Sequence, residues 1–228
     1  MKKAALSGKK PYPQVKICGL TRVDEAVACI EAGADAVGCV FYPPSPRCVT
    51  EDQARDIVRA LPSLAWVVGV FVDDAYSSIL AIVEKCRLRA VQLHGREPPR
   101  LVESLRRQGL TVIKALFHKG MPPISHATLY RPSAFLVECA GGVLPGGNAM
   151  AWDWGVARGI TNGRPLLLAG GLNPGNVAAA VRQSAPDGVD VSSGVESGPG
   201  RKDLEKVKRF IEEIRAIPPS GEIQRIFP

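Results

Sequence analysis

Short apolar runs alternate with longer segments of helical periodicity along most of the chain. The apolar runs are rich in Val, Ile, Leu and Ala, and most are continuous rather than alternating, which is typical of parallel strands covered on both faces. Eight strands are predicted, at residues 14–17, 36–41, 65–71, 90–93, 111–115, 134–137, 165–169 and 188–191. Helices are predicted between them, at residues 24–32, 52–61, 75–85, 98–108, 174–183 and 203–214, with a weaker helix at residues 153–159. Residues 118–131, in the fifth connection, have no clear pattern.

Two of the predicted helices have local signatures. Asn173 and Pro174 place a side-chain acceptor at the N-cap and a proline at the first helical position, where the missing N–H does no harm. The last helix carries its apolar residues on one stripe, at Leu204, Val207, Phe210, Ile211 and Ile214.

Eight strand and helix units in 228 residues predict an α/β fold, a closed (β/α)8 TIM barrel in a single domain. We assign residues 14–216 to the barrel, residues 1–13 to an N-terminal extension and residues 217–228 to a C-terminal tail. In the tail, Ile223 and Phe227 either dock on the barrel or fray. An open doubly wound sheet is the alternative, but no Gly-rich fingerprint opens the first helix, as dinucleotide binding requires.

The composition is that of an ordinary folded protein, with 46% hydrophobic and 22% charged residues. The longest apolar run, residues 64–72, is far shorter than the roughly 20 residues of a membrane-spanning helix, and the N-terminus returns to lysine and proline before a secretory signal forms. The six cysteines include no C-x-x-C pair, and the three histidines add no metal-binding spacing. We therefore expect a cytoplasmic protein with reduced thiols, without a metal and without a membrane partner.

A formal charge of +7 favours anionic partners. The Lys and Arg residues are dispersed, however, and their densest groups, at residues 201–202 and 206–209, lie beside acidic residues at helical spacing. This arrangement is typical of a solvated helix face, so nucleic acid is not the expected partner. A small phosphorylated metabolite is therefore the expected anionic partner.

Glycines and polar residues gather after the last two predicted strands, at residues 169–174 and 190–196. In a (β/α)8 barrel the active site lies on the loops after the strands, and the loops after strands seven and eight often bind phosphate. Glycines let backbone N–H groups approach an anion closely, although they also form plain tight turns. Together the two clusters predict a phosphate site at Gly170, Gly171, Ser193 and Gly194.

Other reactive side chains are predicted at the same rim. Arg47 is the cation of a proline-stiffened loop and a natural partner for a carboxylate or phosphate. Gln92 and His94 end the fourth strand, where satisfied structural polar groups are equally plausible. Glu138 directly follows the sixth apolar run and is suited to proton donation, and the glycine-rich residues 139–148 after it have the content of a mobile lid.

Cys18 follows the first predicted strand, and Lys16 lies two residues back on the same strand face. A thiol acts as a base or nucleophile only as the thiolate, which a nearby cation favours. Cys18 and Glu138 are therefore candidates for a base and an acid that face each other across the barrel. A cysteine of the core is the plainer alternative.

These segments, taken together, resemble phosphoribosylanthranilate isomerase, the enzyme of tryptophan biosynthesis, over residues 15–214. The resemblance rests on five motifs in order: VKICGLTR at 15–22, FYPPSPR at 41–47, VQLHG at 91–95, AGGLNP at 169–174 and VDVSSGVE at 189–196.

The resemblance implies the (β/α)8 barrel and an Amadori rearrangement of N-(5'-phosphoribosyl)anthranilate to the corresponding 1-deoxyribulose 5-phosphate, with no cofactor. It implies that Cys18 is the general base, that Arg47 holds the anthranilate carboxylate and that Asp190 meets the sugar hydroxyls. Lys16, Gln92 and His94 join the predicted substrate-binding residues, and the phosphate loops keep the role argued above.

The chain departs from the family pattern at two places. Glu138 stands where the family has an aspartate as general acid, and residues 146–149 read Gly-Gly-Asn-Ala where the family lid reads Gly-Gly-Ser/Thr-Gly. A phosphosugar-binding barrel without catalysis, acting as a sensor or scaffold, is therefore one alternative. A related ribosyl-phosphate isomerase of histidine biosynthesis is another, but that reaction is expected to use paired aspartates, and Cys18 argues against it. Both a monomer and a homodimer are compatible with the sequence.

Overall fold

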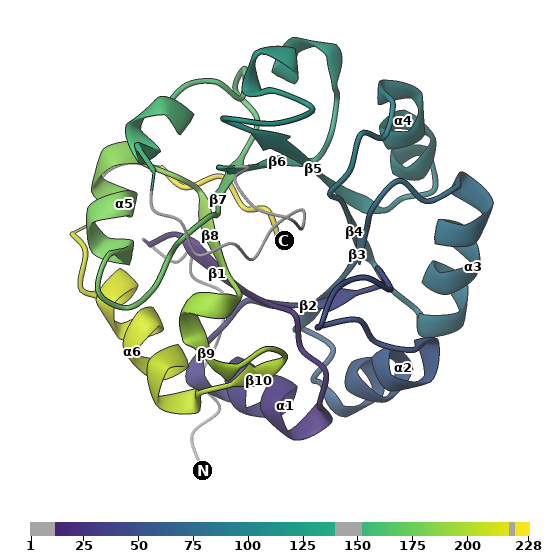
Figure 1. The fold of residues 1–228 in the computed structure, drawn as a ribbon, viewed down its shortest axis with the longest axis horizontal. Coiled ribbons are helices and arrows are strands. Elements are labelled where there is room, and N and C mark those ends of the chain that lie inside the picture. The colour runs from purple at the N-terminus through teal and green to yellow at the C-terminus, as the bar shows by residue number, and fades with distance from the viewer. Residues whose placement is uncertain (1–11, 140–151, 219–221) are drawn as a thin grey trace.

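Eight parallel strands close into a barrel in the computed structural model, which describes residues 12–139, 152–218 and 222–228. Figure 1 looks along the barrel and shows the strands as an inner ring with the helices outside it. The strands are β1 (Gln14–Cys18), β2 (Ala36–Val40), β3 (Trp66–Phe71), β4 (Ala90–Leu93), β5 (Thr111–Phe117), β6 (Ala134–Glu138), β7 (Leu166–Leu168) and β8 (Gly188–Val191). β1 pairs with β8, so the ring is closed and the predicted barrel is confirmed.

Six α-helices cover the barrel over the described residues: α1 (Val23–Ala32), α2 (Glu51–Ala60), α3 (Tyr76–Cys86), α4 (Pro99–Arg107), α5 (Val177–Ser184) and α6 (Leu204–Arg215). Short 3-10 helices replace an α-helix in two connections, at Ile124–Leu129 and Trp154–Ala157, where the sequence pattern was absent or weak. Among the others, α5 starts three residues later than predicted. The Asn173 side chain accepts a hydrogen bond from the Gly175 N–H at 2.8 Å, so it caps a turn that precedes the helix.

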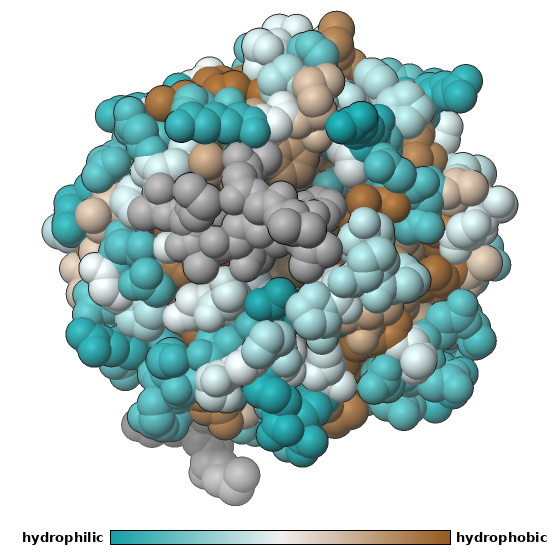
Figure 2. Space-filling view, viewed as in Figure 1, coloured by the Kyte–Doolittle hydropathy of each residue, from teal (hydrophilic) through white to brown (hydrophobic). Residues whose placement is uncertain are grey.

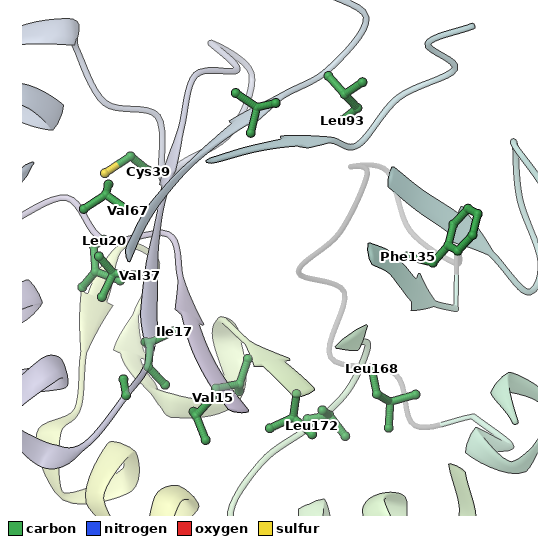
Figure 3. Packing of buried hydrophobic residues seen from close by; sticks show 14 of the residues in the cluster. Val15, Ile17, Leu20, Val37, Cys39, Val67, Leu93, Phe135, Leu168 and Leu172 are labelled. Carbon is green, nitrogen blue, oxygen red and sulfur yellow. The ribbon is translucent and has the colours of Figure 1, made fainter. Parts of the chain in front are cut away.

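The helices pack on the outer face of the barrel through one large apolar cluster. Val15 and Ile17 of β1 point into this cluster, as do Val37 and Cys39 of β2, and Figure 3 shows these side chains on the outside of their strands. The apolar stripe predicted for the last helix is buried against them in α6. Burial of both faces of each strand explains why the strands read as continuous apolar runs.

The interior of the barrel is filled by the alternate strand residues. On β1 these are Gln14, Lys16 and Cys18, and on β8 the residue level with Lys16 is Asp190. Polar groups therefore stand one above another along β1, from Gln14 at the start of the strand to Cys18 at its end.

The C-terminal tail closes the barrel at the ends where the strands begin. Ile226 and Phe227 are buried in the interior cluster, and Figure 1 shows the C-terminus inside the ring of strands. The Gln14 side chain accepts hydrogen bonds from the N–H groups of both residues, at 2.7 and 3.0 Å, and donates one to the Phe227 carbonyl. The tail thus docks through Phe227, as one of the two alternatives held, but with Ile226 as its companion in place of Ile223. The domain boundaries at residues 13 and 216 remain predictions.

Replacing Phe227 with alanine is expected to lower the free energy of unfolding by about 3 kcal/mol, because it empties the interior beneath the barrel of a fully buried ring. Urea denaturation followed by circular dichroism measures the change. Leu64→Ala is the control, since Leu64 is 75% exposed and its loss is expected to change stability by no more than about 0.5 kcal/mol. Equal effects of the two substitutions would mean that the tail contributes nothing to stability.

The helices present polar residues to the outside. Figure 2 shows polar residues over much of the outer ring on this face, with smaller apolar groups between them. Large hydrophobic side chains that are nonetheless exposed include Leu64, Met121 and Leu129. Over the described residues, none of the helices combines the length and apolar character needed to cross a bilayer.

Candidate active site

A cavity that is open at its mouth lies at the ends of the strands opposite the tail. All the predicted site residues except Lys16 line it: Cys18, Arg47, Gln92, His94, Glu138, Gly170, Gly171, Asp190, Ser193 and Gly194. The rule that barrel enzymes bind at the carboxyl ends of their strands therefore predicted the location of the cavity.

Cys18 ends β1 and is 9% exposed, on the cavity wall. Gly38 lies beside it on β2, and a Cβ on Gly38 would stand 2.8 Å from the Cys18 Sγ and 3.2 Å from the Lys16 Nζ. The missing side chain of Gly38 therefore provides the space in which the thiol and the ammonium group meet.

Lys16 lies beneath the cavity and is completely buried. Its Nζ donates to both carboxylate oxygens of Asp190, at 3.0 and 3.1 Å. Burial lowers the pKa of Lys16, but the charge of Asp190 and the Cys18 thiol outweigh burial, so the net shift is upward and the amine stays protonated. The structure thus places Lys16 against Cys18 and Asp190, and substrate in the cavity would meet Asp190 above it.

Burial is the largest influence on the Cys18 thiol, and it raises the pKa of that group. The Lys16 ammonium opposes this shift, and Lys202 opposes it more weakly. The two buried cations therefore limit the rise in the pKa of Cys18 without reversing it.

Glu138 and His94 form a second pair, on the β6 and β4 side of the cavity. The His94 Nε2 lies 3.3 Å from the Glu138 Oε1, and the His94 Nδ1 lies 3.0 Å from the Gln92 Nε2. Glu138 is 4% exposed, yet its buried Oε1 has no hydrogen bond of good geometry among the described residues. Glu138 as a residue lines the cavity, where a carboxyl group is placed to exchange a proton with a bound ligand.

The two predicted phosphate loops lie side by side. Gly194, in the short 3-10 helix after β8, is so close to the loop after β7 that a Cβ on it would overlap the Leu172 carbonyl oxygen. The Asn176 side chain donates to the Gly171 carbonyl at 2.8 Å and holds that loop in place. Gly170, Gly171, Ser193 and Gly194 consequently border one end of the cavity together.

Arg47 reaches the cavity from the loop after β2, but its guanidinium is already engaged. Its Nε and Nη2 donate to the two carboxylate oxygens of Glu196, at 2.9 and 2.6 Å. Glu196 also accepts from the Lys202 Nζ at 2.7 Å. Sequence reasoning passed over Glu196 and Lys202 as participants, although Glu196 ends the quoted motif VDVSSGVE and was a visible signal. Tyr42, Ser45 and Ser192 of the lining were missed as well.

Apart from Cys139, the predicted lid, with Gly146 to Ala149, lies outside the described residues. Trp152, just beyond it, donates its indole N–H to the Ala169 carbonyl at 3.2 Å, and Trp154 donates to the Gly170 carbonyl at 3.4 Å. The described chain after the lid is therefore attached to the first phosphate loop.

Three kinds of comparison identify similar proteins. The family model for N-(5'-phosphoribosyl)anthranilate (PRA) isomerase matches residues 15–213. The N-(5'-phosphoribosyl)anthranilate isomerase of Desulfatibacillum aliphaticivorans is 55% identical over 199 residues, which cover 87% of this chain and 91% of the relative.

Solved structures agree with these matches. The dimeric phosphoribosylanthranilate isomerase of Thermotoga maritima, crystallised as generated monomers, has a TM-score of 0.79 at 38% identity, over 90% of this chain and all of the other. A phosphoribosyl anthranilate isomerase in complex with reduced 1-(o-carboxyphenylamino)-1-deoxyribulose 5-phosphate matches with the same score, identity and coverage.

Proposed function

Because this chain belongs to the N-(5'-phosphoribosyl)anthranilate isomerase family, we propose that the cavity at the carboxyl ends of its strands is where the family reaction takes place. The protein is an isomerase of tryptophan biosynthesis. It converts N-(5'-phosphoribosyl)anthranilate to 1-(2-carboxyphenylamino)-1-deoxyribulose 5-phosphate by an Amadori rearrangement. The single observation that carries the site assignment is that Cys18 and Glu138, the predicted base and acid, line one cavity with both phosphate loops.

In the proposed mechanism Glu138 first donates its proton to the furanose ring oxygen. The bond from that oxygen to C1' breaks, and the anthranilate nitrogen supplies the electron pair that forms a protonated Schiff base. The Cys18 thiolate then removes the C2' proton, and the electron pair of that bond forms a C1'–C2' double bond while the nitrogen becomes neutral. The resulting enolamine tautomerises to the amino ketose, so the reaction moves protons and consumes no oxidant or reductant.

Lys16 supports the base from below. Its ammonium group is held by Asp190 and lies next to the space that Cys18 occupies beside Gly38. A fixed, buried positive charge stabilises the thiolate more than a solvated one would, because little water screens it. We assign Lys16 to this electrostatic role.

The remaining lining residues sort by the chemistry of the substrate. The backbone N–H groups around Gly170, Gly171, Ser193 and Gly194 are suited to the 5'-phosphate, and Asp190 is suited to the sugar hydroxyls. Arg47 is suited to the anthranilate carboxylate. Gln92 and His94 stand beside Glu138, where they can contact the ribose and orient the acid.

The proposal also covers the partner, the cellular location and the oligomeric state of the protein. A small anionic phosphosugar is the expected partner, and a pathway of amino-acid synthesis supports action in the cytoplasm. The dimeric relative makes a homodimer as reasonable as a monomer.

The wild-type protein is expected to consume freshly generated phosphoribosylanthranilate, which is measured as the loss of that substrate's fluorescence. Reduced product analogue added beforehand is expected to block turnover by occupying the cavity. A protein that binds the analogue and leaves the substrate unchanged would instead be a phosphosugar sensor without catalysis.

A further inference from the structure

A small hairpin that the sequence pattern did not predict lies beside the second phosphate loop. It consists of β9 (Glu196–Gly198) and β10 (Arg201–Lys202), which pair in antiparallel fashion with Lys202 opposite Glu196. The hairpin faces the end of β8, and the Lys202 Nζ also donates to the Ser192 carbonyl at 3.3 Å. Neither Glu196 nor Lys202 lines the cavity. The hairpin is therefore close to the site without forming its wall.

The hairpin holds the guanidinium of Arg47 by one edge. Glu196 takes both the Nε and the Nη2 of Arg47 in a paired, planar contact, which fixes the orientation as well as the position of the group. Arg47 itself is 11% exposed and Glu196 4%. Across the described residues Nη1 makes no hydrogen bond, so it is available to a ligand, and Arg47 is among the residues that line the cavity.

The aliphatic part of Arg47 is fixed as well. It lies against Gly19, where a Cβ would come within 2.5 Å of the Arg47 Cδ. An arginine side chain has several rotatable bonds, and their freedom must be lost before it can hold a carboxylate in one geometry. Gly19 and Glu196 remove this freedom before the substrate arrives.

Lys202 keeps the holding carboxylate charged. Burial raises the pKa of Glu196, but the bonds from Arg47 and the charge of Lys202 outweigh burial and shift it downward, so Glu196 is ionised at neutral pH. The group of two cations and one anion retains one net positive charge, which suits an anionic ligand. The Lys202 side chain is also completely buried, so its ammonium group cannot reach solvent unless the hairpin opens.

We propose that Glu196, braced by Lys202, is a positioning residue that sets Arg47 for the ring carboxylate of the substrate. This inference rests on the proposed function, since it takes the carboxylate-bearing ring as the ligand of Arg47. Glu196 acts through Arg47 and touches no reacting atom. Its contribution is thus to the recognition of substrates that carry a carboxylate on the ring.

The test compares two ligands in the complete protein by calorimetry: reduced product analogue, and the same compound without its ring carboxylate. Glu196→Gln is expected to weaken binding of the first about 10-fold, the value of one hydrogen bond to a charged group, and of the second by less than about 2-fold. In turnover KM rises while kcat changes little. The double variant with Arg47→Ala is expected to bind the first ligand no more weakly than Arg47→Ala alone.

Two further variants keep the result interpretable. Glu196→Asp retains the charge between the two cations but shortens the reach, so it should fold and show a smaller loss for the first ligand only. Glu205→Gln removes an exposed carboxylate that pairs with Lys208 and should change neither affinity. Equal weakening of both ligands, or no weakening, in Glu196→Gln and Glu196→Asp would overturn the positioning role. Selective weakening in a protein that never turns over substrate would instead refute the proposed function and leave the positioning role in place.

Discussion

Replacing Cys18 with alanine is expected to lower kcat for phosphoribosylanthranilate by about 10³-fold, within the usual range for loss of a general base. Cys18 is the residue of β1 that lines the cavity, and the Lys16 ammonium beneath it favours the thiolate form. Alanine removes one sulfur atom without introducing a polar group, so the fold and the binding of reduced product analogue should persist. The loss of substrate fluorescence measures kcat, and calorimetry measures the binding.

The acid limb of the pH profile adds a check on the same residue. Because burial raises the pKa of Cys18, only a small fraction of the thiol is ionised at neutral pH, and kcat/KM of the wild type should rise as the pH is raised above neutrality. This dependence should vanish from the residual activity of the alanine variant.

Cys39→Ala is the matched control for Cys18→Ala. Cys39 is also buried, and burial raises its pKa to about 12, but its side chain points to the outer cluster rather than into the barrel. We expect nearly full kcat from this variant. Undiminished turnover in Cys18→Ala would remove Cys18 from the mechanism.

The barrel was predictable because its evidence is local. Each strand is buried on both faces, so each appears as one apolar run, and Cys18, His94 and Glu138 could be placed at strand ends by counting along those runs. The connection at residues 118–131 could not be predicted, because its 3-10 helix is only six residues long and has no room for helical periodicity.

The depth of a side chain inside the barrel, and its partner in an ion pair, were harder to predict than its position along a strand. Lys16 shares a face with Cys18, but two residues of strand cover about 6.6 Å, which is enough to put Lys16 beneath the cavity instead of on its wall. The contact of Arg47 with Glu196 joins residues 149 positions apart through a hairpin of seven residues. Nothing in the sequence around Arg47 indicates a contact with Glu196, and nothing around Glu196 indicates Arg47. Only the folded structure therefore reveals that the Arg47 guanidinium is already bound to Glu196.

Replacing Glu138 with glutamine is expected to lower kcat by about 10²-fold to 10³-fold, because an amide of nearly the same shape cannot donate the proton that opens the furanose ring. Glu138 lines the cavity beside His94, so its carboxyl group is placed to reach a bound substrate. KM should change little, since the phosphate loops remain intact. Fluorescence assays over a range of substrate concentrations separate the two parameters, and Glu213→Gln, on the outside of α6, is the control.

Glu138→Asp shows whether the longer acid is an adaptation or an impairment. The cavity brings His94 to 3.3 Å from the Glu138 Oε1, and shortening the side chain by one methylene withdraws the carboxyl from that contact by more than an ångström. If Gln92, His94 and the strand positions are adjusted to the longer acid, Glu138→Asp should lose activity, by up to about 10²-fold as for other misplacements of this size. A variant faster than the wild type would contradict the adjustment. Because both side chains are carboxylic acids of similar strength, a large difference in kcat between them reports mainly where the proton is held.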